Sequence, residues 1–167
     1  MTLRLILIRH AKSSWDDPTL DDHDRRLNAR GRAAADAIGG WLAGKGYQPD
    51  AVLSSTARRT VETWQGLAPH LNPDTEVEFS SGLYHASPQA MLTALGRQSR
   101  DTVLLLGHNP GTAGLAAGLV SKPVDHAAFD RYPTAATAVL DFDADNWKAI
   151  RPGTGDLVDF VVPRDLA

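Results

Sequence analysis

The sequence predicts a three-layer α/β/α fold with a mainly parallel central sheet and an antiparallel addition at the C-terminus. Short apolar runs at Leu5–Ile8 and Thr102–Gly107 are typical of strands buried on both faces of a parallel sheet, and helix-like segments separate them. The tail beyond Ala138 has a different, hairpin-like pattern. Because no linker, internal repeat or low-complexity segment interrupts the 167 residues, we expect a single domain over 1–167.

The first helix is predicted from its two ends. Asn28 can cap a helix that runs to about Leu42, and Gly44 and Gly46 are expected to end it. Helical spacing then indicates which side is buried. The expected apolar face comprises Ala34, Ala37, Ile38, Trp41 and Leu42.

A short buried strand at 51–53 is predicted to lead into the second helix. Ser55 or Thr56 can cap this helix, and the prolines at 69 and 73 stop it. Its expected buried side comprises Val61, Trp64, Leu67 and Ala68.

The second half of the chain continues the alternation of strands and helices and ends in extended segments. A serine followed by a proline is a strong helix start, because the hydroxyl caps and the proline suits the first helical position. The predicted elements are an edge strand at 76–79, a helix from Ser87–Pro88, the strand at 102–107, a helix from Asn109 to about Val120, a hairpin of 138–140 with 147–150, and a last extended piece at 157–162.

Composition excludes several classes of function. The formal net charge of −3 argues against non-specific nucleic-acid binding, because such domains are usually basic. No apolar run approaches the roughly 18 residues of a membrane span, and the N-terminal run is too short for a signal peptide. The chain has no cysteine, which removes thiol nucleophiles and thiolate zinc sites and fits a cytoplasmic protein. We therefore expect neither nucleic acid nor a membrane as a partner.

Histidines follow the two clearest strands. Arg9 and His10 end the first strand and His108 ends the second. Because ligands bind at the carboxyl ends of parallel strands, we expect both imidazoles in one crevice. A third strand end runs into a helix start that carries Arg58 and Arg59, and a helix N-terminus beside an arginine suits an anion. These residues predict a pocket for a dianion, most simply phosphate.

The strand-end residues resemble the histidine phosphatase superfamily, the phosphoglycerate-mutase-like proteins. Arg9-His10-Ala11 is similar to that superfamily's arginine-histidine-glycine signature, with alanine in place of glycine, and Gly107-His108 is similar to its second histidine motif. The resemblance implies the phosphoglycerate-mutase-like fold and a single histidine phosphatase domain. It also implies that His10 is the nucleophile and that Arg9 and His108 contact the phosphoryl group.

The resemblance extends to three further segments. Ser55, Arg59 and Thr63 have the spacing of the superfamily's second motif, which implies that Arg59 rather than Arg58 holds the phosphate. The segments similar to the small phosphohistidine phosphatases, the SixA-like branch, are 26–31 and 83–86.

The resemblance implies a two-step transfer that needs no metal and no cofactor. His10 attacks phosphorus and water then hydrolyses the phosphohistidine, while the two arginines and His108 stabilise charge. Where many members carry a glutamate as proton donor, this chain has His85. An alkoxide leaving group needs an acid, whereas an imidazole can leave already protonated. The absence of a glutamate at this position therefore favours a phosphohistidine substrate. The candidate donors are His85 and a carboxylate of the 16–24 loop.

The expected function is dephosphorylation of phosphohistidine in a protein, such as a phosphotransfer domain, with inorganic phosphate as product. The alternatives are a small-molecule phosphomonoesterase or mutase of the same fold, a non-catalytic phosphate-binding module, and a metal hydrolase built on the histidines and Asp21–Asp24. Tyr84 and Trp15 are expected to pack rather than to contact substrate. For Lys12, contact with substrate and simple solvation are equally good interpretations. The candidate substrate contacts are Lys12, Arg58 and Asn109.

Overall fold

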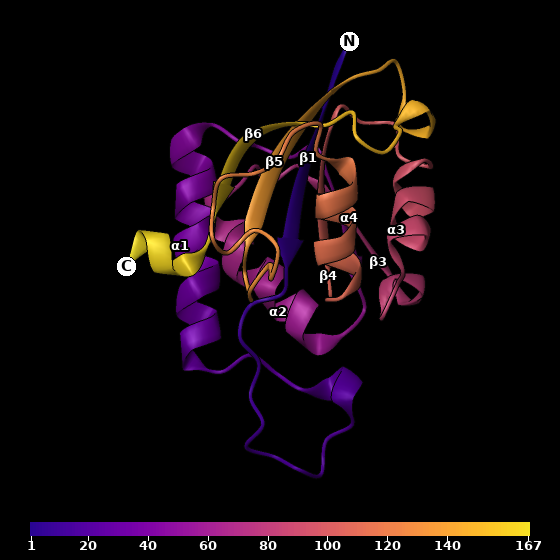
Figure 1. Cartoon of the computed structure of the whole chain (residues 1–167). Helices are drawn as coiled ribbons and strands as arrows, with labels where there is room; N and C mark the ends of the chain where they lie inside the picture. The colour runs from indigo at the N-terminus through magenta and orange to yellow at the C-terminus, as the bar shows by residue number, and fades with distance from the viewer.

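A six-stranded sheet forms the centre of the protein, and helices cover both of its faces (Figure 1). The computed structural model describes residues 1–167. None of its helices combines the length and the apolar character that a membrane crossing requires. The strands are β1 (Thr2–Arg9), β2 (Ala51–Ser55), β3 (Glu76–Ser80), β4 (Thr102–Gly107), β5 (Thr137–Asp143) and β6 (Asp156–Val161), and the helices are α1 (Ala29–Lys45), α2 (Arg58–Leu67), α3 (Pro88–Leu95) and α4 (Gly111–Leu119).

The strand order is β3-β2-β4-β1-β5-β6, and the sheet is mainly parallel as predicted. Strands β3, β2, β4 and β1 run parallel to one another, whereas β5 and β6 are antiparallel additions. Arg9 at the end of β1 is in register with Gly107 at the end of β4. The residues that follow these two strands therefore leave the sheet side by side.

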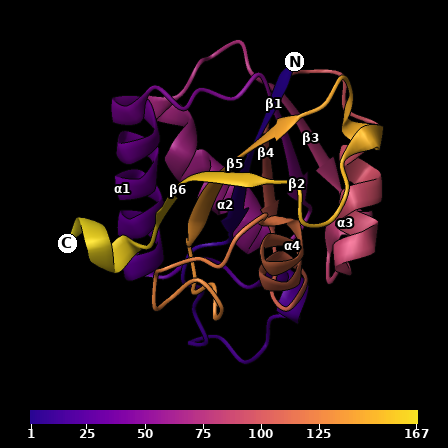
Figure 2. The same cartoon turned by 45° about the horizontal axis from the view of Figure 1, so that its top comes forward.

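Each face of the sheet has its own apolar core, which explains why residues 5–8 of β1 form an uninterrupted apolar run. Ile6 and Ile8 belong to a cluster with residues of α1 and α2, whereas Leu5 and Leu7 belong to a cluster with residues of α3 and α4. Figure 2 shows the α1–α2 pair on one side of the sheet and the α3–α4 pair on the other. Burial on both sides makes β1 a rigid support for the residues at its end.

The predicted helix ends are largely confirmed. The Asn28 side chain accepts a hydrogen bond from the Gly31 N–H (2.8 Å), and Gly46 ends α1 in the left-handed conformation with φ of 76°. The Ser87 hydroxyl caps α3 by accepting from the Ala90 N–H (3.1 Å). Gly44 was expected to end α1 but lies inside it, because one left-handed residue is enough to terminate the helix.

The prediction for α2 was wrong about its cap and about most of its buried side. Ala57 occupies the N-cap position. Val61 and Trp64 are only half-buried. The buried side faces polar strand ends, so hydroxyl groups with backbone partners suit it better than apolar side chains: the Thr63 hydroxyl donates to the Arg59 carbonyl (2.7 Å) and accepts from the Ala11 N–H (2.9 Å). The buried residues are Arg59, Thr60, Thr63 and Leu67.

The predicted C-terminal hairpin has a different second strand. Strand β5 pairs with β6, not with 147–150, and the pairing contains an irregularity after Val139. Residues Trp147–Ala149 form a single 3-10 turn. The Trp147 side chain is buried and its indole N–H donates to the Arg100 carbonyl (2.6 Å), which ties this turn to the start of β4 and keeps it out of the sheet.

Candidate active site

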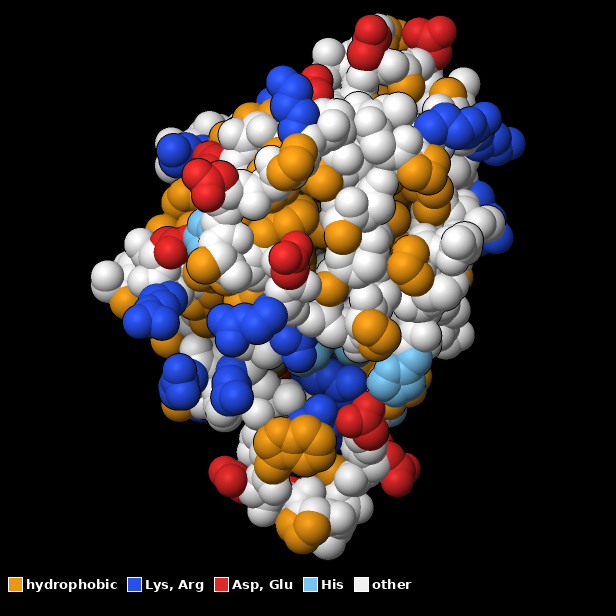
Figure 3. All heavy atoms as spheres, in the orientation of Figure 1, with side chains coloured by type: hydrophobic (Ala, Val, Ile, Leu, Met, Phe, Trp, Pro, Cys, Tyr) orange, Lys and Arg blue, Asp and Glu red, His pale blue; other side chains and the backbone are white.

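The two strand-end histidines face one another at the carboxyl edge of the sheet. His10 follows β1 and His108 follows β4, both are buried, and their ring centroids lie 5.2 Å apart. They line a hollow of about 250 Å³. Figure 3 shows Lys, Arg and His side chains gathered on this face, just above the loop that follows β1. The predicted residues that line the hollow are Arg9, His10, Lys12, Arg59, His85, His108 and Asn109; the lining residues that were not predicted are Ser13, Trp15, Arg25 and Thr134.

Backbone contact fixes the orientation of the His10 ring. Its Nδ1 lies 2.7 Å from the Ala11 carbonyl oxygen, which can only accept, so Nδ1 carries the proton and the lone pair is on Nε2. Burial, reinforced by the positive charges of Arg59 and Arg9, lowers the pKa of His10 to about 3. At neutral pH the imidazole is therefore uncharged and nucleophilic.

His108 is held from the neighbouring strand. Its Nε2 is hydrogen-bonded to the Ser55 hydroxyl at the end of β2 (2.8 Å), and its Nδ1 is buried without a protein partner. Burial, and then the proximity of His10, lower the pKa of His108 to about 3. Ser55 belongs to the predicted second motif, but its contact with His108 could be seen only once β2 and β4 were paired.

Arg59 and Arg58 point to different places. The Arg59 side chain is 4% exposed and lines the hollow, whereas that of Arg58 is 46% exposed and pairs with Glu62 one turn along α2 (2.9 Å). The candidate substrate contact Arg58 is thus outside the hollow, because one residue turns the side chain by about 100° around a helix. Arg9 and Arg59 each retain a buried Nε–H with no protein partner, which leaves both guanidiniums donor capacity for an anion.

The loop after β1 contributes a carboxylate to the site, and the structure shows which residue of the predicted 16–24 loop supplies it. Asp22 accepts from Arg59 (Nη2 to Oδ2, 3.1 Å) and from the Tyr84 hydroxyl, and His85 Nε2 lies 3.6 Å from the same carboxylate oxygen. Burial would raise the pKa of Asp22, but the hydrogen bonds from Tyr84 and Arg59 and the charges of Arg59 and Arg25 outweigh it and lower the pKa. In sequence, Asp22 is one of several adjacent aspartates, and nothing in the spacing distinguishes it.

Tyr84, which was expected to pack rather than to contact substrate, does not line the hollow but supports residues at its edge. Its hydroxyl bonds to Asp22, and its ring lies against that of His85 with centroids 3.9 Å apart. His85 adopts a left-handed backbone conformation with φ of 57°, and its exposed side chain lies at the rim of the hollow. Asp21–Asp24 do not gather into a group of three or more side chains that could hold a metal ion together.

Asn109 lines the hollow but its polar atoms are already engaged. Its amide nitrogen donates to the carbonyls of Arg131 and Tyr132 (both 3.0 Å), and its side-chain oxygen accepts from the Ala113 N–H in α4 (3.1 Å). These bonds tie Asn109 to the start of α4 and to the segment at 131–132. Lys12 is exposed at the rim of the hollow and forms no ion pair within the protein.

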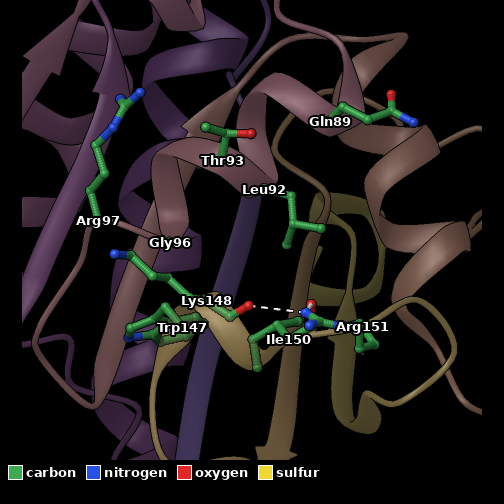
Figure 4. Close-up of a pocket in the computed structure, with 9 residues that line it drawn as sticks. All are labelled: Gln89, Leu92, Thr93, Gly96, Arg97, Trp147, Lys148, Ile150 and Arg151. Carbon is green, nitrogen blue, oxygen red and sulfur yellow. Dashed lines mark hydrogen bonds between the residues drawn. The ribbon is translucent and has the colours of Figure 1, made fainter.

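A larger hollow of about 490 Å³ lies between α3 and the turn at 147–151, near the amino ends of the strands (Figure 4). Its charged lining residues are Arg97, Lys148 and Arg151. Figure 4 shows their ends pointing in different directions, and Arg151 donates to the Lys148 carbonyl. This hollow contains neither a histidine nor a carboxylate, so it offers no equivalent of the paired imidazoles.

The hollow thus brings together an uncharged, buried imidazole with a free Nε2, a second histidine, and guanidiniums with unpaired donors, a set of groups suited to holding an anion. Comparison with known proteins agrees. The sequence profile of the histidine phosphatase superfamily (branch 1) matches residues 5–91. The chain belongs to this superfamily and to its SixA-like branch.

The relatives cover nearly the whole chain. The uncharacterized protein Rv1276c of Mycobacterium tuberculosis is 38% identical over 164 residues, which cover 94% of this chain and 100% of that protein. The crystal structure of an Agrobacterium tumefaciens protein provisionally named phosphohistidine phosphatase SixA is 32% identical, with a TM-score of 0.78 over 96% of this chain and 98% of that one. The protein histidine phosphatase SixA complexed with tungstate shares the fold, with 21% identity and a TM-score of 0.80 over 99% and 100% of the two chains.

Proposed function

We propose that this protein is a metal-independent phosphatase that removes the phosphoryl group from phosphohistidine in a protein through a covalent intermediate on His10. One observation carries the proposal: the neutral His10 ring directs its proton to the Ala11 carbonyl and keeps the Nε2 lone pair free. Arg9 and Arg59 line the same hollow with unpaired donors. The site thus combines a nucleophile with charge stabilisation for the transferring group.

The reaction has two balanced steps. The His10 Nε2 lone pair forms a bond to phosphorus as the P–N bond of the substrate breaks; the substrate ring already carries a proton on its other nitrogen, so it keeps the electron pair and leaves as neutral imidazole. Water then attacks phosphorus, the bond to Nε2 breaks, both water protons leave on the released dihydrogen phosphate, and His10 returns to its neutral form with the proton on Nδ1. Arg9 and Arg59 stabilise the oxygen charge in both steps, and the buried His108 Nδ1 is the remaining polar atom without a protein partner.

The available acids favour cleavage of a P–N bond. Asp22 has a lowered pKa, so it is ionised and a poor donor near neutral pH, and the His85 side chain is largely solvated. A positioned acid contributes about 10²–10⁴-fold when a strongly basic alkoxide leaves. A site without such an acid therefore suits a leaving imidazole better than an unactivated phosphate ester. The names of the SixA relatives point to the same substrate class.

A substrate panel tests the proposal. Turnover of a phosphohistidine protein should exceed that of sugar, glyceryl and aryl phosphates and should persist with a chelator. His10→Ala should abolish turnover, and radiolabelled phosphate should be trapped on His10 as an acid-labile species.

His126→Ala is the matched control, because His126 pairs with Asp165 and does not line the hollow. Rapid aryl phosphate cleavage with poor phosphohistidine cleavage would favour a phosphomonoesterase, and loss of activity with the chelator would contradict the metal-independent mechanism.

A further inference from the structure

Trp15 is the most exposed of the large apolar side chains, and it lines the active-site hollow. Its exposure is 75%, compared with 67% for Met1 and 43% for Phe79. It is also the only hydrophobic residue among those that line the hollow. Tryptophan is enriched among the residues that dominate binding interfaces, where its large ring is covered by a partner. An indole left open at this place is therefore a candidate contact for substrate.

The indole is held in place before any substrate binds. The Arg25 guanidinium lies over its ring at 3.5 Å from the centroid. Arg25 is itself buried and donates to the Ser13 hydroxyl (2.9 Å) and to the Asp22 carboxylate (3.2 Å). One face of the indole is thus covered by a fixed cation, and the rest of the ring remains accessible to solvent.

The backbone on both sides of the 13–27 loop is also fixed. The Ser14 N–H donates to the Arg26 carbonyl (2.8 Å) and the Asn28 N–H donates to the Lys12 carbonyl (3.0 Å), which closes the base of the loop just before Trp15. A side chain ordered in advance loses little conformational entropy on binding. Trp15 therefore has the rigidity of a recognition residue rather than the freedom of a loop tip.

The size of the hollow places the body of the substrate on the rim. At about 250 Å³ the hollow lies below the range of about 300–1,000 Å³ that holds a whole small ligand. With the phosphoryl group beside His10, the remainder of the substrate must extend over the exposed rim residues. These are Lys12, Trp15 and His85.

We propose that Trp15, clamped by Arg25, is a specificity-determining residue that packs against an apolar or planar side chain flanking the phosphohistidine of the protein substrate. This inference rests on the proposed function and adds the part of the substrate that the rim recognises. Trp15 contacts the carrier of the phosphoryl group, not the phosphoryl group itself. Its removal should weaken recognition of a phosphorylated protein without impairing the chemistry.

Two substrates that share a P–N bond but differ in what carries it test this role. Phosphoramidate supplies a P–N bond with no organic body, and a phosphotransfer domain phosphorylated on histidine supplies the full carrier. Trp15→Ala should lower kcat/KM on the phosphorylated domain by about tenfold, mainly by raising KM, and should leave phosphoramidate within about twofold. Trp15→Phe should recover most of the loss, because a smaller aromatic ring keeps a stacking surface. Leu20→Ala, in the same loop but outside the hollow, is the control and should change neither substrate.

Other results would overturn the inference. An equal loss on both substrates would mean that Trp15 only supports Arg25 and the loop, and unchanged turnover of the phosphorylated domain would mean that the indole is not a contact. Failure of the proposed function would look different, because the unaltered protein would then not dephosphorylate the domain. Failure of this inference alone would mean that the unaltered protein and Trp15→Ala dephosphorylate the domain equally well.

Discussion

Replacing Arg59 and Arg58 separately by alanine tests which arginine serves the site. The two residues are adjacent in α2, carry the same charge and have the same side chain, so each is a control for the other. Arg59 lies in the hollow with His10, whereas Arg58 is exposed and pairs with Glu62. We expect Arg59→Ala to lose most of the activity and Arg58→Ala to keep it.

The expected magnitudes follow from the two environments. Two unit charges about 4 Å apart attract by about 4 kcal/mol at an effective dielectric constant of about 20, which corresponds to roughly 10³ in rate if the attraction is realised only in the transition state. Loss of one donor to a developing oxyanion costs about 10²–10³ in other enzymes. Because the Arg58 pair is exposed on a helix, its loss should cost only about 0.3–0.5 kcal/mol of stability, and turnover should remain within about twofold.

The assay is kcat/KM on phosphoramidate and on a phosphohistidine protein, measured beside thermal unfolding so that loss of fold is separated from loss of chemistry. Arg59→Lys adds a second comparison, because it keeps the charge but loses the planar fork that can bind two oxygens at once. Equal losses for the Arg58 and Arg59 variants, or a larger loss for Arg58→Ala, would refute the assignment.

Two further predictions concern stability. The pKa values of His10 and His108 are about 3 in the fold and about 6.5 when unfolded, so the unfolded chain binds more protons between these values. The free energy of unfolding should therefore fall as the pH drops below about 6.5, by up to about 1.4 kcal/mol per pH unit for each histidine. Urea unfolding measured across this pH range should show a weaker pH dependence in His10→Gln. A slope of opposite sign would contradict the assignment. Gly31→Ala should destabilise the protein by about 1–3 kcal/mol, since the added Cβ would lie 2.1 Å from the Lys12 carbonyl oxygen. Gly44→Ala, in the same helix, would meet nothing within 4 Å and should stabilise the protein by about 0.5–1 kcal/mol. Thermal unfolding that ranks the two variants the other way would show that Gly31 is not tightly packed.

Local patterns predicted the parts of the fold whose causes are local. The double burial of β1 follows from its uninterrupted apolar run, and the starts of α1 and α3 follow from the capping side chains of Asn28 and Ser87. The convergence of His10 and His108 was also predictable, because the carboxyl ends of parallel strands meet at one edge.

Tertiary contacts decided what local patterns could not. The buried side of α2 is polar because it faces strand ends that need hydrogen-bond partners. The spacing of apolar residues along α2 therefore predicts the wrong buried side. The second strand of the C-terminal hairpin is β6, because the intervening Trp147 is drawn to the start of β4.

The sequence by itself determined the strand ends that carry His10 and His108, since these depend on patterns within a few residues of each group. Only the tertiary structure brought Asp22 to Arg59 and placed the exposed Trp15 beneath Arg25 at the rim. The physical reason is that the loop after β1 has no periodicity of its own. Its path is set by contacts with α2 and Tyr84, which lie far from it along the chain.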